Sequence, residues 1–112
     1  MEVARTARVR GEVHLVHLDP TLGSEIQKTR PCLVVSPDEM NRFIRTVIVA
    51  PLTSRGRLYP TRIRCTFDER AALVVLDQIR TVDVSRLVRR LGQIDPDTMV
   101  NVLAALGRMF AP

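Results

Sequence analysis

The apolar residues of this chain fall in short runs that stop at turn-forming residues, and this spacing constrains the fold more than any single motif does. The runs are rich in valine, isoleucine and leucine and are shorter than ordinary helices, so they favour strands. Turn signals such as Asp19-Pro20 separate them. The pattern predicts a mostly β domain with strands within residues 12–18, 32–37, 46–52, 61–67, 72–82 and 86–94.

The C-terminal segment follows a helical period instead. Asp95-Pro96 is typical of a helix start, because aspartate caps the first turn and proline fits the first helical position. We expect the apolar residues that follow at helical spacing to pack against the sheet, and these are Met99, Val102, Leu103, Leu106 and Phe110. Many short strands followed by one helix predict a small β-barrel with a C-terminal helix packed on it.

A shorter helical turn is expected at residues 37–43, before the third strand. Ser36 stands where an N-cap residue would, Pro37 would take the first helical position, and Glu39 would complete a capping box. The stretch 21–29, by contrast, is polar and carries no packing pattern. We therefore expect it to be a loop at the entrance of the second strand.

The composition fits one globular domain over residues 1–112, with residues 1–9 as a flexible N-terminal tail. No apolar run approaches the roughly 20 residues of a membrane-spanning helix, and the N-terminus lacks the apolar stretch of a secretory signal. We therefore expect a cytoplasmic protein without a membrane partner. Cys32 and Cys65 lie in strand-like runs without a metal-ligand spacing, so both are expected to be free thiols.

Charge gives the first functional indication. The chain has 17 basic and 12 acidic residues, a net charge of +5, and Lys28 is its only lysine. Arginine binds phosphate oxygens through two parallel hydrogen bonds, so an arginine-rich surface suits nucleic acid. A GC-rich genome would produce the same bias without any such partner, and the composition alone leaves both explanations open.

Several enzyme classes are disfavoured because their motifs are absent from the sequence. There is no Gly-rich phosphate loop, no H-E-x-x-H and no C-x-x-C motif. The two histidines, His14 and His17, are three residues apart on an expected strand, so their side chains should face opposite sides of the sheet. We therefore expect no metal site and no cofactor.

Two polar residues at strand ends remain as candidates. Arg30 precedes Pro31, which favours extended backbone at the start of the second strand, and Thr53 ends the third strand. If these strands pair antiparallel, Arg30 and Thr53 come together beside the polar loop. The alternative is a surface arginine and a threonine that merely ends its strand, and spacing alone does not decide between the two.

An ordered set of motifs over roughly residues 10–110 resembles the MazF/PemK family of toxins. The motifs are Gly11 followed by an acidic residue, Asp19-Pro20-Thr21, Gly23-Ser24-Glu25, Arg30-Pro31 before a valine-rich strand, Asn41, VAPLTS at 49–54, Tyr59-Pro60, LDQIRTVD at 76–83 and RLGQID at 90–95. The resemblance implies an SH3-like β-barrel and a homodimer. It also implies the toxin of a toxin–antitoxin pair, inhibited by a cognate antitoxin with an acidic C-terminal tail.

The activity implied by the resemblance is metal-independent, sequence-selective cleavage of single-stranded RNA, which would inhibit translation and growth. Attack by the 2′-hydroxyl would leave 2′,3′-cyclic phosphate and 5′-hydroxyl ends. The family's catalytic arginine and threonine match Arg30 and Thr53, and its acidic loop residue matches Glu25. Expected RNA contacts are Thr21, Ser24, Gln27, Lys28, Asn41, Arg55, Tyr59 and Gln78. Many members have Gln directly after the loop Glu, whereas Ile26 intervenes here, which bears on the choice of RNA sequence.

The chemistry of the reaction fits these side chains. An arginine can bind the phosphate oxygens and stabilise charge that develops on them, and a threonine hydroxyl can donate to the same phosphate. Arg30 suits charge stabilisation, with proton donation to the leaving oxygen as a further role. Glu25 is one candidate for the general base, and the sequence does not settle that assignment. We expect the loop 21–29 to cover the RNA while the buried strand holds Arg30 rigid.

Two other classes of function remain open from the sequence. One is a non-enzymatic poison of DNA gyrase on the same barrel, like the CcdB toxins, and the presence of Arg30-Pro31 and Thr53 speaks against it. The other is a nucleic-acid-binding barrel without turnover, which would need aromatic stacking platforms. One tyrosine and three phenylalanines are few for that purpose.

Overall fold

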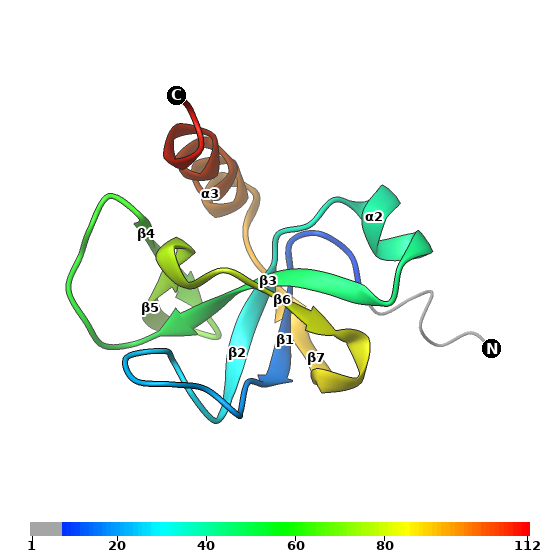
Figure 1. The fold of residues 1–112 in the computed structure, drawn as a ribbon. Helices are drawn as coiled ribbons and strands as arrows, with labels where there is room; N and C mark the ends of the chain where they lie inside the picture. Colours follow the sequence, from blue (N-terminus) through cyan, green and yellow to red (C-terminus); the bar gives the residue numbers. More distant parts are fainter. Residues whose placement is uncertain (1–7) are drawn as a thin grey trace.

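A computed structural model describes residues 8–112, and their strands form one curled antiparallel sheet, with one short helix between the second and third strands and a longer helix after the last strand (Figure 1). The strands are β1 (Glu12–His17), β2 (Thr29–Val34), β3 (Thr46–Thr53), β4 (Arg62–Phe67), β5 (Arg70–Val75), β6 (Arg80–Asp83) and β7 (Leu87–Gln93). The helices are α2 (Asp38–Phe43) and α3 (Pro96–Met109), and two 3-10 turns are η1 (Leu76–Gln78) and η2 (Val84–Arg86). The predicted mostly β fold with a C-terminal helix is confirmed.

Strand β3 is the centre of the sheet. The strand order is β4-β5-β3-β2-β1-β7, and β6 pairs with the first half of β3 while β5 pairs with its end. The chain passes from one pairing to the other through η1, so the apolar stretch expected at 72–82 divides into two strands. Curling brings the outer strands β4 and β7 close enough for the Phe67 ring to approach Gly92, which gives the sheet its half-barrel shape.

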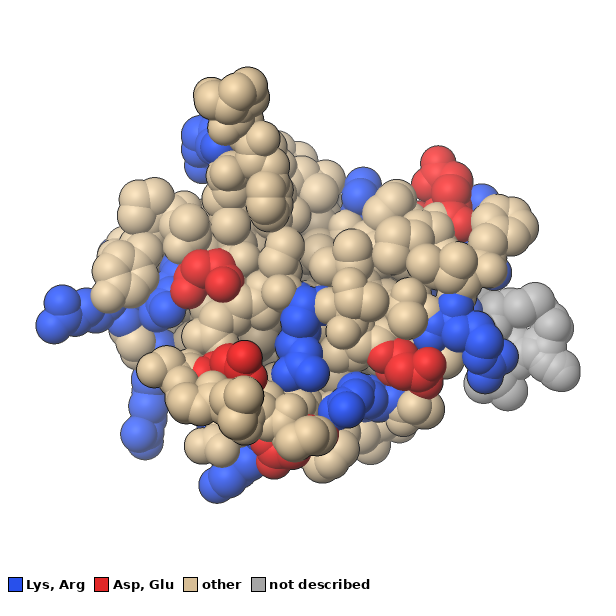
Figure 2. Space-filling model, viewed as in Figure 1, with Lys and Arg blue, Asp and Glu red and all other residues tan. Residues whose placement is uncertain are grey.

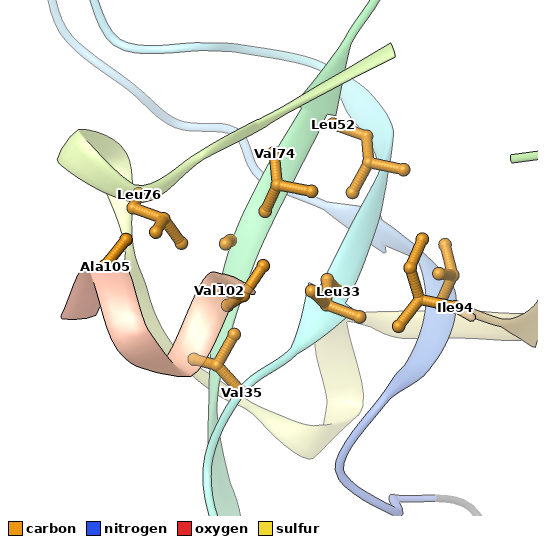
Figure 3. Close-up of a cluster of buried hydrophobic side chains, with 10 residues drawn as sticks. Leu33, Val35, Leu52, Val74, Leu76, Ile94, Val102 and Ala105 are labelled. Carbon is orange, nitrogen blue, oxygen red and sulfur yellow. The ribbon is translucent and has the colours of Figure 1, made fainter. Parts of the chain in front are cut away.

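Two apolar clusters fill the two sides of this sheet. The first lies between the sheet and α3 (Figure 3) and includes Leu33, Val35, Leu52, Val74, Leu76, Ile94, Val102 and Ala105. The second lies on the other side and consists of Val16, Leu18, Cys32, Val34, Val47, Val49 and Val82. Strands β2 and β3 contribute to both clusters, which explains why their sequences are continuously apolar rather than alternating.

Helix α3 begins as the sequence predicts but buries a different set of residues. Asp95 is the N-cap and its side chain accepts from the Thr98 amide. The buried residues of the helix are Thr98, Val102 and Ala105, one helical turn or two apart, with Met99, Leu106 and Met109 packed beside them. The expectation for Leu103 and Phe110 was wrong, because their positions turn away from the face of Val102 and Ala105 and are exposed.

The predicted cap of the short helix was also wrong. Pro37 is the N-cap of α2 and no side chain caps the helix. Ser36 is buried instead, where its hydroxyl donates to Asn41 Oδ1 and accepts from the Ile48 amide at 3.1 Å. The Asn41 amide nitrogen donates to the Ser36 carbonyl at 3.0 Å. The serine therefore ties the helix to strand β3 rather than capping it.

The expected flexible tail of residues 1–9 falls mostly on residues 1–7, which lie outside the described residues. Arg8 donates to the Asn41 carbonyl at 2.9 Å, and the Val9 amide donates to the Glu12 carboxylate at 3.0 Å. Within residues 8–112, no helix has the length and apolar character needed to cross a membrane. Cys32 and Cys65 are free thiols, as predicted.

Candidate active site

Strands β2 and β3 bring Arg30 and Thr53 together. The strands pair antiparallel with Cys32 opposite Pro51 and Leu33 opposite Ala50. Continuing this register by two residues sets Arg30 opposite Thr53, and residues opposite each other in an antiparallel pair project from the same face. Both residues line one pocket of ≈ 610 Å³ at the ends of the two strands. The meeting expected from the sequence is thus confirmed as geometry, whereas the catalytic role of the two residues stays a prediction.

The hydrogen bonds of the two side chains leave their reactive groups available. Arg30 donates through Nε to the Gln27 carbonyl at 3.2 Å, which fixes the base of the guanidinium. Its terminal nitrogens have no hydrogen-bond acceptor among residues 8–112. The Thr53 hydroxyl oxygen accepts from the Arg55 amide at 3.2 Å, so its proton is free to be donated. The pair can therefore offer several donors to one anion.

A second hollow of ≈ 580 Å³ continues from Thr53 toward the start of α3. It shares Thr53, Ser54, Ala71 and Ala72 with the first pocket. The first pocket lies between the β4–β5 hairpin and strand β7, and the second lies between that hairpin and α3. Together they make a trough with Thr53 near its middle, which suits an extended chain better than a compact ligand.

The loop that precedes Arg30 is attached to the barrel. The Ile26 amide donates to Gln78 Oε1 at 2.7 Å, and the Ile26 side chain packs on the second apolar cluster. The Lys28 amide donates to the Asp19 carboxylate at 2.9 Å. The loop is therefore held by a few specific contacts and does not lie free over the pocket.

Glu25 does not line the pocket of Arg30 and Thr53. Its carboxylate accepts from the Leu22 amide at 2.8 Å, within its own turn. Glu25 and Gln78 border a neighbouring pocket of ≈ 410 Å³ together with Pro51, Asp77 and Arg80. A role for Glu25 as the base would therefore require the loop to move.

The other expected RNA contacts are dispersed. Thr21, Ser24, Gln27 and Lys28 lie on the loop before β2, and Arg55 and Tyr59 lie on the exposed segment between β3 and β4. The Arg62 guanidinium lies over the Tyr59 ring, and its Cζ is 4.8 Å from the ring centroid. Asn41 was wrongly expected at the RNA surface, because it is 1% exposed and its side chain bonds to Ser36.

Neither thiol near the pocket is a candidate nucleophile. Burial raises the pKa of the Cys32 thiol to about 12, although the positive charge of Arg80 acts in the opposite direction. Burial, together with the negative charge of Asp95, also raises the pKa of Cys65, which borders the second hollow. Because the thiolate is the reactive form, these raised pKa values disfavour both cysteines as nucleophiles.

Other charged residues near the site are already paired. The Arg62 guanidinium donates to both oxygens of Asp77 at 3.1 Å and holds the pKa of that carboxyl below its usual range. Arg80 donates to the Leu18 carbonyl and Arg86 to the His17 carbonyl, each at 3.1 Å. Figure 2 shows that basic and acidic side chains alternate over this view of the molecule. The positive charge is therefore spread over the surface, and several arginines hold the fold through hydrogen bonds to carboxylates and carbonyls.

Sequence reasoning missed the far side of the pocket. Ser54, Asp68, Arg70 and Arg89 line it together with Arg30 and Thr53. The turn before Arg70 and the Arg89-Arg90 pair are visible in the sequence as polar residues at strand ends and on an edge strand. No local pattern shows that the β4–β5 hairpin and β7 approach each other, because that proximity comes from the curl of the whole sheet.

The chain matches a known family over most of its length. The model of the PemK-like, MazF-like toxins of type II toxin–antitoxin systems matches residues 9–110. Endoribonuclease PemK of Escherichia coli is 41% identical over 111 residues, which cover 89% of this chain and 77% of that protein. Endoribonuclease EndoA of Bacillus subtilis (strain 168) is 38% identical over 104 residues, which cover 87% of this chain and 89% of that protein.

Solved structures agree with this match. A crystal structure of MazF from Deinococcus radiodurans superposes with a TM-score of 0.81 at 27% identity, covering 92% of this chain and 96% of that one. An endoribonuclease in complex with its cognate antitoxin, from a mycobacterial species, superposes with a TM-score of 0.79 at 28% identity. That match covers 95% of this chain and 98% of the mycobacterial one.

Proposed function

Because the chain belongs to the PemK-like, MazF-like toxins of type II toxin–antitoxin systems, we propose that it cleaves RNA in the pocket of Arg30 and Thr53. The chain is an endoribonuclease toxin, and endoribonucleases about 40% identical to it support this over most of its length. The gyrase-poison and binding-only alternatives are not favoured by these relatives. The observation that carries the placement of the site is the register that sets Arg30 opposite Thr53.

The proposed reaction is attack of an RNA 2′-hydroxyl on the adjoining phosphorus. A bond forms between the 2′-oxygen and phosphorus, the bond to the 5′-oxygen breaks, and the products carry a 2′,3′-cyclic phosphate and a 5′-hydroxyl. The free terminal nitrogens of Arg30 bind the non-bridging oxygens and stabilise the charge that develops on them. The Thr53 hydroxyl donates to the same phosphate, and the leaving 5′-oxygen takes a proton from the Arg30 guanidinium, which recovers it from water. These donors supply the electrostatic stabilisation without a metal ion.

The proton of the 2′-hydroxyl needs an acceptor, and Glu25 remains the proposed one. Its carboxylate lies in the adjoining pocket and bonds to the Leu22 amide, so it reaches the substrate only after the loop rearranges. The loop contacts with Gln78 and Asp19 are few enough for such a rearrangement. The backbone of Arg30 is held by strand β2, although the hydrogen bond from its Nε to the Gln27 carbonyl links its side chain to the loop.

The partners follow from the same family. The complex of a related endoribonuclease with its cognate antitoxin supports an antitoxin as the partner of this chain. We propose that an acidic C-terminal tail of the antitoxin competes with RNA for the basic trough, and that both act in the cytoplasm, where RNA and free thiols are found.

We also propose a homodimer through the outer face of α3. Val100, Leu103 and Phe110 form an exposed apolar stripe along this face. Asp97 and Arg108 flank the stripe on one side, near opposite ends of the helix. In an antiparallel pair of α3 helices related by a two-fold axis, each Asp97 would face the Arg108 of the partner copy, so the charges that flank the stripe are complementary to themselves.

A cleavage assay on a long mixed-sequence RNA in excess EDTA tests the site. We expect wild type to cut, and Arg30→Ala and Thr53→Val to lose about 10²–10³-fold in rate, as when an oxyanion donor is removed. Thr53→Ser is the matched control, because it keeps the hydroxyl and should retain most of the activity. RNA whose 2′-hydroxyls are replaced by hydrogen should not be cut.

Three results would contradict the proposal. If folded wild-type protein cuts no long transcript, the proposed ribonuclease activity is wrong. If Arg30→Ala cuts RNA as fast as wild type, the proposed location of the active site is wrong. If EDTA abolishes cleavage, the proposed metal-independent mechanism is wrong.

A further inference from the structure

The pocket of Arg30 and Thr53 contains two more arginines that no step of the proposed reaction uses. Arg70 begins strand β5 and Arg89 lies on strand β7, and both line the pocket. We propose that Arg70 and Arg89 bind the nucleotide next to the scissile phosphate, with its phosphate on the two guanidinium groups. This inference rests on the function proposed above and names a subsite of the same trough.

Arg70 and Arg89 are available for such binding, whereas other arginines are not. Neither one makes a hydrogen bond or an ion pair with any residue in the range 8–112. In contrast, Arg90, the neighbour of Arg89, donates to the Glu12 carboxylate at 2.9 Å, and Arg62 is bound to Asp77. Two unpaired guanidinium groups in one pocket repel each other unless an anion joins them, which favours an anionic ligand.

The backbone fixes the position of Arg70. Asp68 and Glu69 both have left-handed backbone angles, with φ of 54° and 63°, and form the tight turn between β4 and β5. Such a turn matches the twist of a two-stranded hairpin, and Phe67 and Arg70 pair directly across it. Arg70 therefore leaves the hairpin at a defined place, and Asp68 of the same turn also lines the pocket.

Part of the pocket lining is apolar, which indicates that the ligand is more than a bare phosphate. Pro31, Leu52, Phe67 and Leu91 line the pocket together with the arginines. The Phe67 ring lies against Gly92, so the β4–β5 hairpin and β7 are in contact beside the pocket. A lining that combines apolar and aromatic side chains with arginines suits an unstacked base and its phosphate. Of the acidic residues, Asp68 alone is in the lining within residues 8–112, so three arginines outweigh one carboxylate.

The test measures binding separately from cleavage. The probe is a mixed-sequence single-stranded RNA with a 2′-O-methyl group on every nucleotide, which binds but cannot be cut through its 2′-oxygen. Its dissociation constant is measured for wild type, Arg70→Ala and Arg89→Ala at several salt concentrations. Each phosphate contact to a single strand contributes about −0.7 to the slope of log K against log salt.

We expect each alanine variant to flatten that slope by about 0.7 and to weaken binding about two- to fivefold at 0.1 M salt. Arg70→Lys and Arg89→Lys keep the charge and should restore the wild-type slope, which a structural role would not predict. Arg42→Ala is the matched control, because Arg42 is exposed on α2 and lies over the Phe43 ring, away from the pocket lining. It removes the same charge and should leave the slope unchanged.

The outcomes separate this inference from the function on which it rests. Wild-type slopes for Arg70→Ala and Arg89→Ala, with cleavage of ordinary RNA still dependent on Arg30, would overturn the subsite and leave the active site standing. Unchanged RNA binding together with weaker inhibition by the cognate antitoxin would assign the two arginines to the antitoxin and also overturn it. Absence of any RNA binding or cleavage by wild type would overturn both proposals.

Discussion

Gly92 lies where the two outer strands of the sheet approach each other. A Cβ atom at this position would stand 3.2 Å from two carbons of the Phe67 ring. That distance is shorter than an ordinary van der Waals contact, so an added methyl group has to displace the ring. The absence of a side chain at Gly92 thus allows β4 and β7 to meet without sharing hydrogen bonds.

We therefore expect Gly92→Ala to lower the free energy of unfolding by about 1–2 kcal/mol, as overpacked sites do. Urea denaturation measures this directly. In a Phe67→Leu background the ring is gone, so Gly92→Ala should cost much less there, and the difference is the coupling between the two residues. Equal costs in both backgrounds would show that the ring does not limit the space at Gly92.

At the residue scale, sequence reasoning succeeded where strands adjacent in the chain determine the geometry. Arg30 and Thr53 could be placed because β2 and β3 follow each other and pair antiparallel. Asn41 matched a family motif, but a motif does not show whether a side chain points inward, and Asn41 is buried against Ser36. Arg70 and Arg89 come together through the accumulated twist of a whole sheet, which no local pattern encodes.

At the element scale, the loop between β1 and β2 depends on Gln78 of η1. The Gln78 side chain accepts from the Ile26 amide, and its own amide group is 3.5 Å from the Ser24 carbonyl. These contacts join the loop to a rigid part of the barrel, whereas most of the loop's other side chains are exposed. The loop should therefore open by losing few contacts.

We expect Gln78→Ala to speed hydrogen exchange of the Ile26 amide about five- to tenfold, because it removes one hydrogen bond of about 1 kcal/mol. Exchange followed by NMR or mass spectrometry of the loop peptide measures this change. Gln27→Ala, in the same loop, serves as the control, because the hydrogen bond to Arg30 uses its backbone carbonyl. Identical Ile26 exchange in wild type and Gln78→Ala would show that Gln78 does not hold the loop.

The strands themselves were largely predictable from the sequence, and the errors have physical causes. Short apolar runs mark strands that are buried on both sides, as β2 and β3 are. The stretch 72–82 contains no glycine or proline, so its sequence does not predict that η1 divides it into two strands. On α3, apolar residues occupy two faces of the helix, and the period alone does not say which face meets the sheet.

At the scale of the whole molecule, α3 differs from an ordinary surface helix because it carries a second, exposed apolar face. Phe110 is 71% exposed and Val100 is 65% exposed. Side chains of this kind in one stripe mark interaction surfaces more often than scattered single residues do. The proposed homodimer would bury them against a second copy.

We expect wild type to sediment as a dimer and Phe110→Glu to shift it toward monomer, weakening association about tenfold or more, because the substitution removes apolar area and places charge in the interface. Sedimentation across a range of protein concentrations gives the dimer dissociation constants of wild type and of Phe110→Glu. Phe43→Glu is the matched control, because Phe43 is 80% exposed but lies on α2. A monomeric wild type, or equal effects of both substitutions, would contradict the α3 interface.

The outer strands β4 and β7 have one hydrogen-bonded neighbour each among the described residues. Their sequences carry Arg62 and Arg64 on β4, and Arg89 and Arg90 on β7. Charged residues on edge strands discourage pairing with other chains. On the reaction proposed above, removing the Thr53 hydroxyl inactivates the toxin and leaves these edge charges in place, whereas neutralising the arginines of β4 and β7 would remove a protection against pairing with other chains.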